Sequence, residues 1–358
     1  MRILVDVNHP AHVHLMRPIL EQWRARGHEC RVTARDKDVT VGLLDGYGIP
    51  HQILGRVRPG RSGRLRELVE REVRFLAVAR AFRPQLIAGT TVHAGRVGRL
   101  VGAKSMVLNE DDARVVPAFR WISYPLASAI VTPECLAYED YGPRHLTYPS
   151  YQELFYLHPN RFTPDPAVLR ELGVAQGEPY GLIRLSGLDA HHDDGVRGVS
   201  RELLQQVIAL ASGRTRLFLS GEKPLAPELE PLRAAIAPQR MHDAMAFASF
   251  VLGDSQTMTA EAAVLGVPAF RINDFVGRLS YLEDLQGYGL AFGFKPGQES
   301  QVLQALDEVL AMPDRQEQFG RRREKLLAER IDPLPWFLEE ADRLLGIPAA
   351  PRPTATAG

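Results

Sequence analysis

The chain has 358 residues, which is long for one doubly wound domain and enough for two domains of roughly 150–180 residues. Hydrophobic residues make up 45% of the sequence and charged residues 24%, a composition that can bury real cores and argues against disorder. The 43 basic and 43 acidic side chains cancel. No global field therefore attracts nucleic acid, and we expect no nucleic-acid partner.

The two cysteines, Cys30 and Cys135, lack the spacing of a metal or redox motif. The first residues enter a strand pattern at once, without the charged and apolar regions of a secretory signal. No apolar run approaches the roughly 18–20 residues of a membrane span. These features predict a cytoplasmic protein with reduced thiols.

The N-terminal half alternates short apolar runs with amphipathic segments, which predicts βαβ units and a mostly parallel sheet. The predicted elements are strands at 3–7, 29–34, 86–88, 105–108 and 129–131 and helices at 13–26, 38–47, 62–82 and 94–101. A stretch rich in proline and tyrosine follows from Pro143 and has no period, so it predicts a linker over 151–178.

The same alternation then restarts. It predicts strands at 180–185, 216–220, 248–253 and 268–271 and helices at 198–212, 225–236, 257–266, 301–311, 314–329 and 335–345. The chain therefore reads as α/β, with two Rossmann-like doubly wound domains at 1–150 and 179–332 and a terminal helix within 333–346. The tail 347–358, rich in Ala, Pro and Thr, is predicted to be disordered.

Ligands in open α/β sheets bind outside the carboxyl ends of the strands, so the loops after strands are the candidate sites. The first is Asp6-Val-Asn-His-Pro-Ala-His-Val-His, which gathers Asn8, His9 and His12 where a helix start attracts anions. It contains no glycine and no zinc-protease glutamate, so we expect neither a dinucleotide fingerprint nor a metal. The structural alternative is that Asn8 caps the helix and Pro10 lies in its first turn.

Two further loops follow strands of the N-terminal half. Ala88-Gly-Thr-Thr-Val-His places Thr90 where a ligand, or a closely packed helix, approaches the backbone. Leu108-Asn-Glu-Asp-Asp-Ala-Arg holds three adjacent carboxylates, beginning with Glu110, and ends at Arg114. Neighbouring carboxylates raise one another's pKa, which is one way to make a general acid or base. A solvated loop with a helix-capping Asp is the alternative.

The loop Arg184-Leu-Ser-Gly-Leu-Asp-Ala-His-His follows the first strand of the second half. Arg184 can pair bidentately with phosphate, and Ser186 lies beside it. His191 and His192 titrate near neutrality and have several aspartates nearby to orient them. This density of polar groups predicts a ligand-binding or catalytic loop.

The loop Gly253-Asp-Ser-Gln-Thr-Met-Thr-Ala-Glu follows a later strand and enters a helix of small residues. Its polar residues Asp254, Ser255, Gln256 and Thr257 offer hydroxyls and free N–H groups that suit a phosphate. A carboxylate one and a half turns into the helix, Glu261, can accept both hydroxyls of a ribose. The alternative is ordinary Ser or Thr capping with Glu261 in solvent.

This last segment resembles the nucleotide-sugar signature of GT-B glycosyltransferases and non-hydrolysing UDP-GlcNAc 2-epimerases, in which a serine-rich turn binds the diphosphate and a glutamate the ribose. Ser255 and Glu261 match that spacing. Together with the segments at 6–14, 33–38 and 156–162, the sequence over 1–345 is similar to one uncharacterised domain-of-unknown-function family of that clan. The resemblance implies a GT-B fold whose last helix crosses back onto the N-terminal domain.

The resemblance to the epimerases can be followed by residue. Their Glu-Ala-Gly-Leu-Arg segment supplies a catalytic carboxylate, and Glu110 and Arg114 keep that spacing. Their His-Gly-Asp-Thr-Thr segment carries a further Asp, where this chain has Thr90, which cannot act as an acid or base. Their His-Arg-Arg loop has only a loose counterpart at His191 and His192. The departure at Thr90 argues against epimerase chemistry.

We therefore hypothesise a metal-independent glycosyltransferase-like enzyme of cell-envelope or polysaccharide synthesis. It would use a nucleotide sugar, UDP-linked, as substrate without a further cofactor, with His9, His12 or Glu110 as base and a glycan or lipid-linked acceptor. The alternatives are a UDP-GlcNAc 2-epimerase, using Glu110 and His191 or His192, and a non-catalytic nucleotide-sugar-binding subunit. A homodimer stays open. A basic face around residues 56–74 leaves peripheral membrane association open too, although interleaved glutamates favour a solvated helix face.

Overall fold

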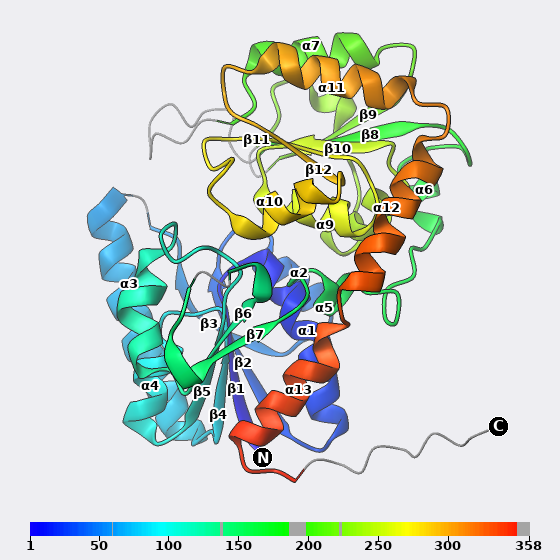
Figure 1. Cartoon of the computed structure of the whole chain (residues 1–358). Helices are drawn as coiled ribbons and strands as arrows, with labels where there is room; N and C mark the ends of the chain where they lie inside the picture. Colours follow the sequence, from blue (N-terminus) through cyan, green and yellow to red (C-terminus); the bar gives the residue numbers. More distant parts are fainter. Residues whose placement is uncertain (59, 137–138, 186–197, 222–223, 349–358) are drawn as a thin grey trace, which may run out of the picture.

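The computed structural model describes residues 1–58, 60–136, 139–185, 198–221 and 224–348. They form two α/β units, one above the other in Figure 1, each built on a parallel sheet. The predicted α/β class with two doubly wound domains is confirmed.

The N-terminal domain contains a seven-stranded parallel sheet in the order β3-β2-β1-β4-β5-β6-β7. Its strands are β1 (Arg2–Val7), β2 (Glu29–Asp36), β3 (His51–Arg56), β4 (Leu86–Gly89), β5 (Lys104–Leu108), β6 (Ala129–Pro133) and β7 (His145–Tyr148). Its helices are α1 (Pro10–Ala25), α2 (Thr40–Gly46), α3 (Gly60–Phe82) and α4 (Ala94–Val101). Every residue of β4 and β6 is buried, as expected for parallel strands covered on both faces.

The second domain contains a five-stranded parallel sheet in the order β12-β11-β10-β8-β9. Its strands are β8 (Tyr180–Leu185), β9 (Arg216–Gly221), β10 (Phe250–Gly253), β11 (Ala269–Ile272) and β12 (Ala291–Phe294). Its helices are α7 (Arg201–Ala211), α8 (Met241–Ala246), α9 (Gln256–Val264), α10 (Ser280–Gly287), α11 (Glu299–Ala311) and α12 (Arg315–Glu329).

The helix predicted at 225–236 is wrong. That segment contains Pro227 and Pro231, and proline inside a helix removes a hydrogen bond and clashes with the preceding turn. The segment instead forms a short 3₁₀ turn at Glu230–Leu232 and then runs beside β9, where the Ala234 N–H donates to the Leu219 carbonyl at 2.8 Å.

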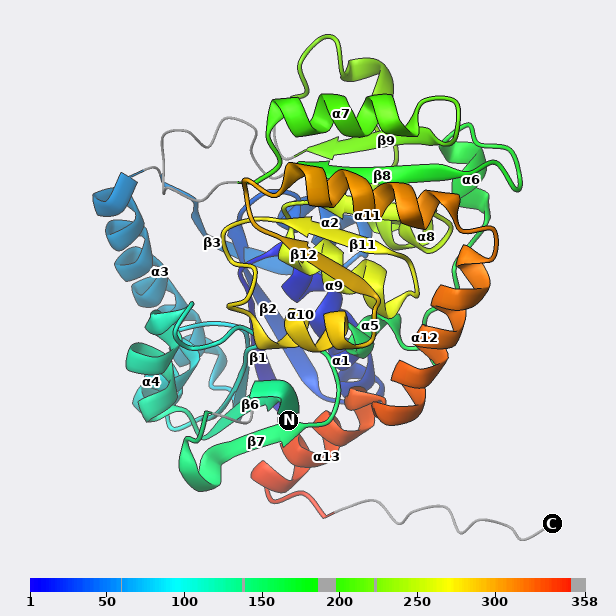
Figure 2. The same ribbon diagram turned by 45° about the horizontal axis from the view of Figure 1, so that its top comes forward.

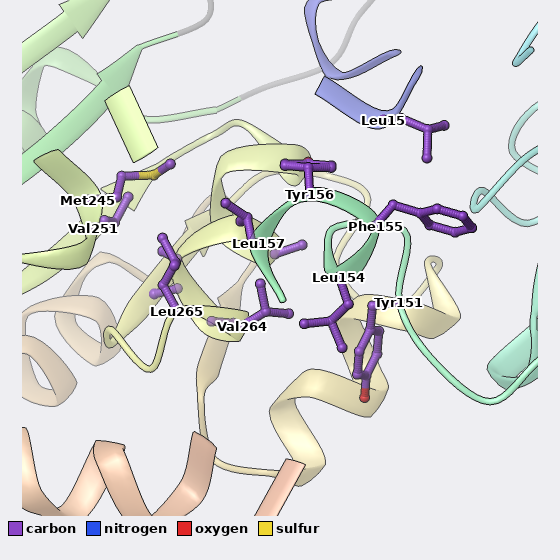
Figure 3. Close-up of a cluster of buried hydrophobic side chains, with 14 of the residues drawn as sticks. Leu15, Tyr151, Leu154, Phe155, Tyr156, Leu157, Met245, Val251, Val264 and Leu265 are labelled. Carbon is purple, nitrogen blue, oxygen red and sulfur yellow. The ribbon is translucent and has the colours of Figure 1, made fainter. Parts of the chain in front are cut away.

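The segment between the two sheets begins as core rather than as an open linker. Helix α5 (Leu154–Leu157) is buried completely and packs against α1, α9 and α13. Figure 3 shows Leu157 and Leu154 on the side of Val264 in α9, and Phe155 on the side of Leu15 in α1. The segment then becomes exposed in parts and carries α6 (Ala167–Glu171). Because α5 joins both apolar interiors, one hydrophobic cluster contains residues of both domains.

The last helix, α13 (Pro333–Leu344), lies against the N-terminal domain beside α1 (Figures 1 and 2). Phe337 meets Trp23 with ring centroids 6.0 Å apart, and Arg26 pairs with Asp342 at 2.8 Å. Helix α12 therefore spans from one domain to the other before the chain ends. Among the described residues, no helix combines the length and the apolar character needed to cross a bilayer.

Candidate functional site in the interdomain cleft

Two cavities adjoin between the domains, at the carboxyl ends of β1, β4, β5, β8 and β10. One, of about 400 Å³, lies between the start of α1, the ends of β8 and β9 and the start of α9. The other, of about 740 Å³, lies on the side of the N-terminal domain. Both are lined by His9, Ala11, Gln256 and Thr257, so they form one continuous cleft.

The start of α9 forms one wall of the smaller cavity. Ser255 is the N-cap, and its hydroxyl accepts from the Met258 N–H at 3.3 Å. The Asp254 carbonyl accepts from the Asn273 side chain at 3.0 Å, which fixes the turn before the helix. The N–H groups of Gln256 and Thr257 lie in the first turn and have no acceptor within the helix. This wall offers hydrogen-bond donors and the positive end of a helix dipole to an anion.

Glu261 is predicted as a ribose ligand, with exposure to solvent as the alternative, and it lies buried at the floor of the same cavity with 4% of its surface exposed. Its Oε1 accepts from the Tyr156 hydroxyl and from His242 Nε2, both at 2.9 Å. Among the described residues, none donates to Oε2. The carboxylate is therefore fixed on one side by the protein and offers its second oxygen to a ligand in the cavity.

Arg184 ends β8 and also lines the smaller cavity, where its Nη1 donates to the Ser220 hydroxyl at 2.9 Å. Its guanidinium thus faces the space in front of α9. Ser186, His191 and His192 lie outside the described residues, so their predicted roles stay predictions.

The two histidines at the start of α1 line the larger cavity in a neutral form. Burial, followed by the positive charge of Lys37, lowers the pKa of His9 to about 3. Burial lowers the pKa of His12 well below its usual value. The Nδ1 atom of His9 accepts from the Ala11 N–H at 3.3 Å, and that of His12 accepts from the Asn8 N–H at 3.4 Å. Each neutral ring therefore carries its proton on Nε2 and is a hydrogen-bond donor there.

Asn8 orients this loop. The N-cap of α1 is His9, so the structural alternative that assigned the cap to Asn8 is wrong by one residue. Asn8 instead donates to the Thr90 carbonyl at 2.8 Å and accepts from Arg71. Arg71 also pairs with the fully buried Asp6 at 2.9 Å. Thr90 lines the larger cavity, and its hydroxyl is buried without a partner among the described residues.

Carboxyl groups edge the other side of the larger cavity. Glu110 and Asp111 line it, and both follow β5. Burial, followed by the neighbouring Glu153 and Asp111 carboxylates, raises the pKa of Glu110 well above its usual value. Burial and the adjacent Asp112 raise the pKa of Asp111 to about 6.

Glu153, which the sequence did not predict, lines neither cavity and affects the site through the pKa of Glu110. It has 1% of its surface exposed, and burial raises its pKa to about 8. Neither of its oxygens, nor Oε2 of Glu110, has a hydrogen-bond partner among the described residues. We call Glu110, Asp111 and Glu153 the carboxyl cluster. Because like charges this close cannot all ionise, the cluster retains a proton near neutral pH.

The remaining residues of this loop serve the contact between domains. Asp112 is fully buried and accepts from the Ser280 N–H at 2.8 Å and from the Ser280 hydroxyl at 3.0 Å, at the start of α10. Arg114 donates to Asp112 at 3.1 Å and lines neither cavity. Among the described residues, no group of three His, Cys, Asp or Glu side chains is arranged to hold a metal ion.

Two Rossmann-like domains around such a cleft define the GT-B fold, and solved structures of this class match nearly the whole chain. The structure of S. aureus MnaA with UDP matches 97% of each chain at 12% identity, with a TM-score of 0.68. A putative UDP-N-acetylglucosamine 2-epimerase from Listeria monocytogenes matches 96% of each chain at 13% identity, with a TM-score of 0.68. The glycosyltransferase VinC, in complex with dTDP, matches 97% of this chain and 100% of its own at 15% identity, with a TM-score of 0.61.

Residues 1–277 match the family model described as protein of unknown function (DUF354), so the chain belongs to the DUF354 family. The uncharacterized protein MJ0665 of Methanocaldococcus jannaschii is 21% identical over an alignment of 279 residues, and the match covers 74% of this chain and 80% of that protein. The expected membership of a family of unknown function and the expected GT-B fold are confirmed.

Proposed function

We propose that the chain is a glycosyltransferase-like enzyme that binds a nucleoside diphosphate sugar, with UDP as the expected nucleotide, and transfers the sugar to a hydroxyl acceptor in cell-envelope or polysaccharide synthesis. One observation supports this most. The helix start and the Glu261 carboxylate share one cavity, which continues at His9 and Thr257 into a larger cavity edged by carboxyl groups.

In this proposal the nucleotide occupies the smaller cavity. The N–H groups of Gln256 and Thr257, with Arg184, compensate the charge that develops on the leaving diphosphate. Glu261 Oε2 accepts from a ribose hydroxyl. Because these donors supply the positive potential, the transfer needs no metal ion. The solved structures of MnaA with UDP and of VinC with dTDP support a nucleoside diphosphate as the ligand.

The acceptor occupies the larger cavity in this proposal. An ionised carboxylate of the carboxyl cluster, Glu110 or Asp111, takes the proton from the acceptor hydroxyl as the bond to the sugar forms. His9 and His12 donate hydrogen bonds from Nε2 to the sugar or to phosphate, and do not act as bases, since their Nδ1 atoms already accept backbone N–H groups.

A thermal-shift screen against a panel of nucleoside diphosphates and their sugars tests the binding step. We expect UDP and a UDP-sugar to raise the melting temperature, because a ligand that binds only the folded state stabilises it. No shift with any nucleotide would overturn the proposal.

A 2-epimerase reaction is the second candidate, since the buried Glu110 carboxyl edges the space where the sugar lies and the Listeria relative is a putative epimerase. In that reaction a base removes the proton at C2 while UDP leaves. Incubation with UDP-GlcNAc alone in D₂O distinguishes the two. Free UDP together with deuterium at C2, without an acceptor, would replace the transferase proposal by this one, whereas no exchange favours transfer.

A further inference from the structure

Helix α3 is apolar on two opposite faces. Its inner face carries Phe75, Val78, Ala79 and Phe82, which are buried in the hydrophobic cluster beneath the first sheet. Its outer face carries Leu65, Val69 and Val73, whose exposed fractions are 65%, 57% and 64%. These three residues follow one another at intervals of four, so they form a stripe along one side of the helix. We call them the α3 stripe.

The three residues of the α3 stripe form one apolar patch on the surface. Single exposed apolar residues are normal on a soluble protein, whereas apolar residues gathered in a patch mark an interaction site. The helix also lies at the outer edge of the N-terminal domain in both views of the molecule (Figures 1 and 2). Its outer face is therefore open to a partner of large area.

The charges around the stripe are positive. Helix α3 contains six arginines and three glutamates, although the whole chain is neutral. Each glutamate is already paired with arginine: Glu67 with Arg35, Glu70 with Arg58 and Arg66, and Glu72 with Arg96. Arg66 and Arg80 lie seven residues before and after Val73, which places them two turns away on the side of the stripe. The stripe thus lies within a basic surface.

We propose that the α3 stripe and the arginines around it dock the protein on an anionic lipid bilayer. A helix that presents apolar side chains flanked by arginine binds such a surface through burial in the interface and attraction to acidic headgroups. A second copy of the chain fits less well, because a two-fold symmetric contact would place the basic surface against itself.

The α3 stripe adjoins the proposed acceptor cavity, so membrane docking has a role that rests on the proposed transferase function. Arg64, Leu65 and Leu68, in the first turns of α3, line the larger cavity. The docked surface is therefore continuous with the proposed acceptor cavity. An acceptor hydroxyl carried by a lipid would enter that cavity while its apolar part stays in the bilayer.

Cosedimentation with vesicles tests the docking without any nucleotide or substrate. We expect the protein to bind vesicles of equal parts phosphatidylcholine and phosphatidylglycerol, and to bind less to phosphatidylcholine alone or in high salt. The triple variant Leu65→Ser, Val69→Ser, Val73→Ser should lose binding by about tenfold or more. The double variant Arg66→Glu, Arg80→Glu should also lose binding, and mainly the part that depends on acidic lipid.

A matched control replaces exposed apolar residues of the other domain and its flank, Phe247→Ser with Ile331→Ser, and should bind as the wild type does. Melting curves check that each variant is folded. Absence of binding to the acidic vesicles, or equal binding by the triple variant, would overturn the proposal. A wild-type dimer that the triple variant dissociates, seen by light scattering, would assign the stripe to a second copy instead. Nucleotide binding is measured separately, so failure here leaves the proposed function standing.

Discussion

The two walls of the cleft differ in whether their carboxylates have hydrogen-bond donors. On the wall of the second domain, Glu261 is held by two donors, Tyr156 and His242, and lies in the helix whose first turn offers free N–H groups to the cavity. On the opposite wall, Oε2 of Glu110 has no hydrogen-bond partner among the described residues, and neither have the oxygens of Glu153, which is buried outside both cavities. A buried carboxyl without donors destabilises a fold, and a satisfied one costs much less.

The difference separates binding from chemistry. A carboxylate that already accepts two hydrogen bonds is fixed in place, which suits recognition of a ribose. Burial and neighbouring carboxylates raise the pKa values of Glu110 and Asp111, and a raised carboxyl pKa suits proton transfer. Substitution of Glu110 should therefore reduce turnover, and substitution of Glu261 should reduce the affinity for the nucleotide.

The largest expected effect is a loss of turnover when Glu110, on the wall formed by the N-terminal domain, is replaced. Glu110→Gln keeps the size of the side chain but removes its ability to take a proton, so we expect the turnover number to fall by about 10²–10⁴-fold. The affinity for the nucleotide should stay unchanged, because the smaller cavity is not touched. The measurement is release of nucleoside diphosphate from the donor selected by the thermal-shift screen, beside calorimetry of nucleotide binding.

The matched control for this variant is Glu134→Gln, an exposed glutamate of the same domain. It should turn over as the wild type does. If Glu110→Gln retained wild-type turnover while still binding nucleotide, the carboxyl cluster would not take part in the reaction.

A smaller effect is expected on the opposite wall. Glu261→Gln retains an acceptor for Tyr156 and His242 but loses the charge, and hydrogen bonds to charged groups contribute about 1.5–3 kcal/mol. We therefore expect nucleotide binding to weaken by roughly 10–100-fold while the fold stays intact. Calorimetry with UDP measures this, with the exposed Glu324→Gln of α12 as control. Unchanged affinity would show that the ribose binds elsewhere.

The sequence identifies the functional residues of the two walls to different extents. The wall of the second domain follows from local chemistry, since a polar turn after a strand and a glutamate in the next helix lie close together in the chain. The sequence predicted Ser255 and Glu261 there, but not their surroundings. Tyr156 lies 105 residues from Glu261, and its hydrogen bond exists only because α5 is packed between the domains.

The carboxyl cluster is harder to predict for the same reason. Glu110 was visible as one of three adjacent carboxylates after a strand. Glu153 lies in a stretch with many prolines and no period, which predicts a linker and gives no sign that the structure buries this residue. The sequence pattern also missed β3, β7 and β12, whose residues are largely half-buried or exposed and lack the apolar run of a central strand. Short edge elements and segments between domains are determined by packing rather than by local pattern.

The smallest expected effect concerns Glu153 and the pH dependence of stability. Its pKa is raised by burial from 4.5 to about 8, so between those values the folded protein holds a proton that the unfolded chain has released. Stability conferred by this site is present below pH 4.5 and is lost as the pH rises toward 8. Glu153→Gln removes the titration, so we expect the loss of unfolding free energy between pH 5 and 8 to shrink. Denaturant unfolding at the two pH values, with Glu134→Gln as control, measures the change.

The same substitution should move the activity of the site in a direction that a structural role alone does not require. The Glu153 carboxylate contributes to the raised pKa of Glu110, so its removal should lower that pKa. The acid limb of the pH–rate profile should then shift to lower pH, because the carboxylate that takes the proton persists in more acidic solution. A variant with the altered stability slope but an unmoved acid limb would assign Glu153 to the fold alone, and would leave Asp111, whose pKa is raised to about 6, as the group that controls the reaction.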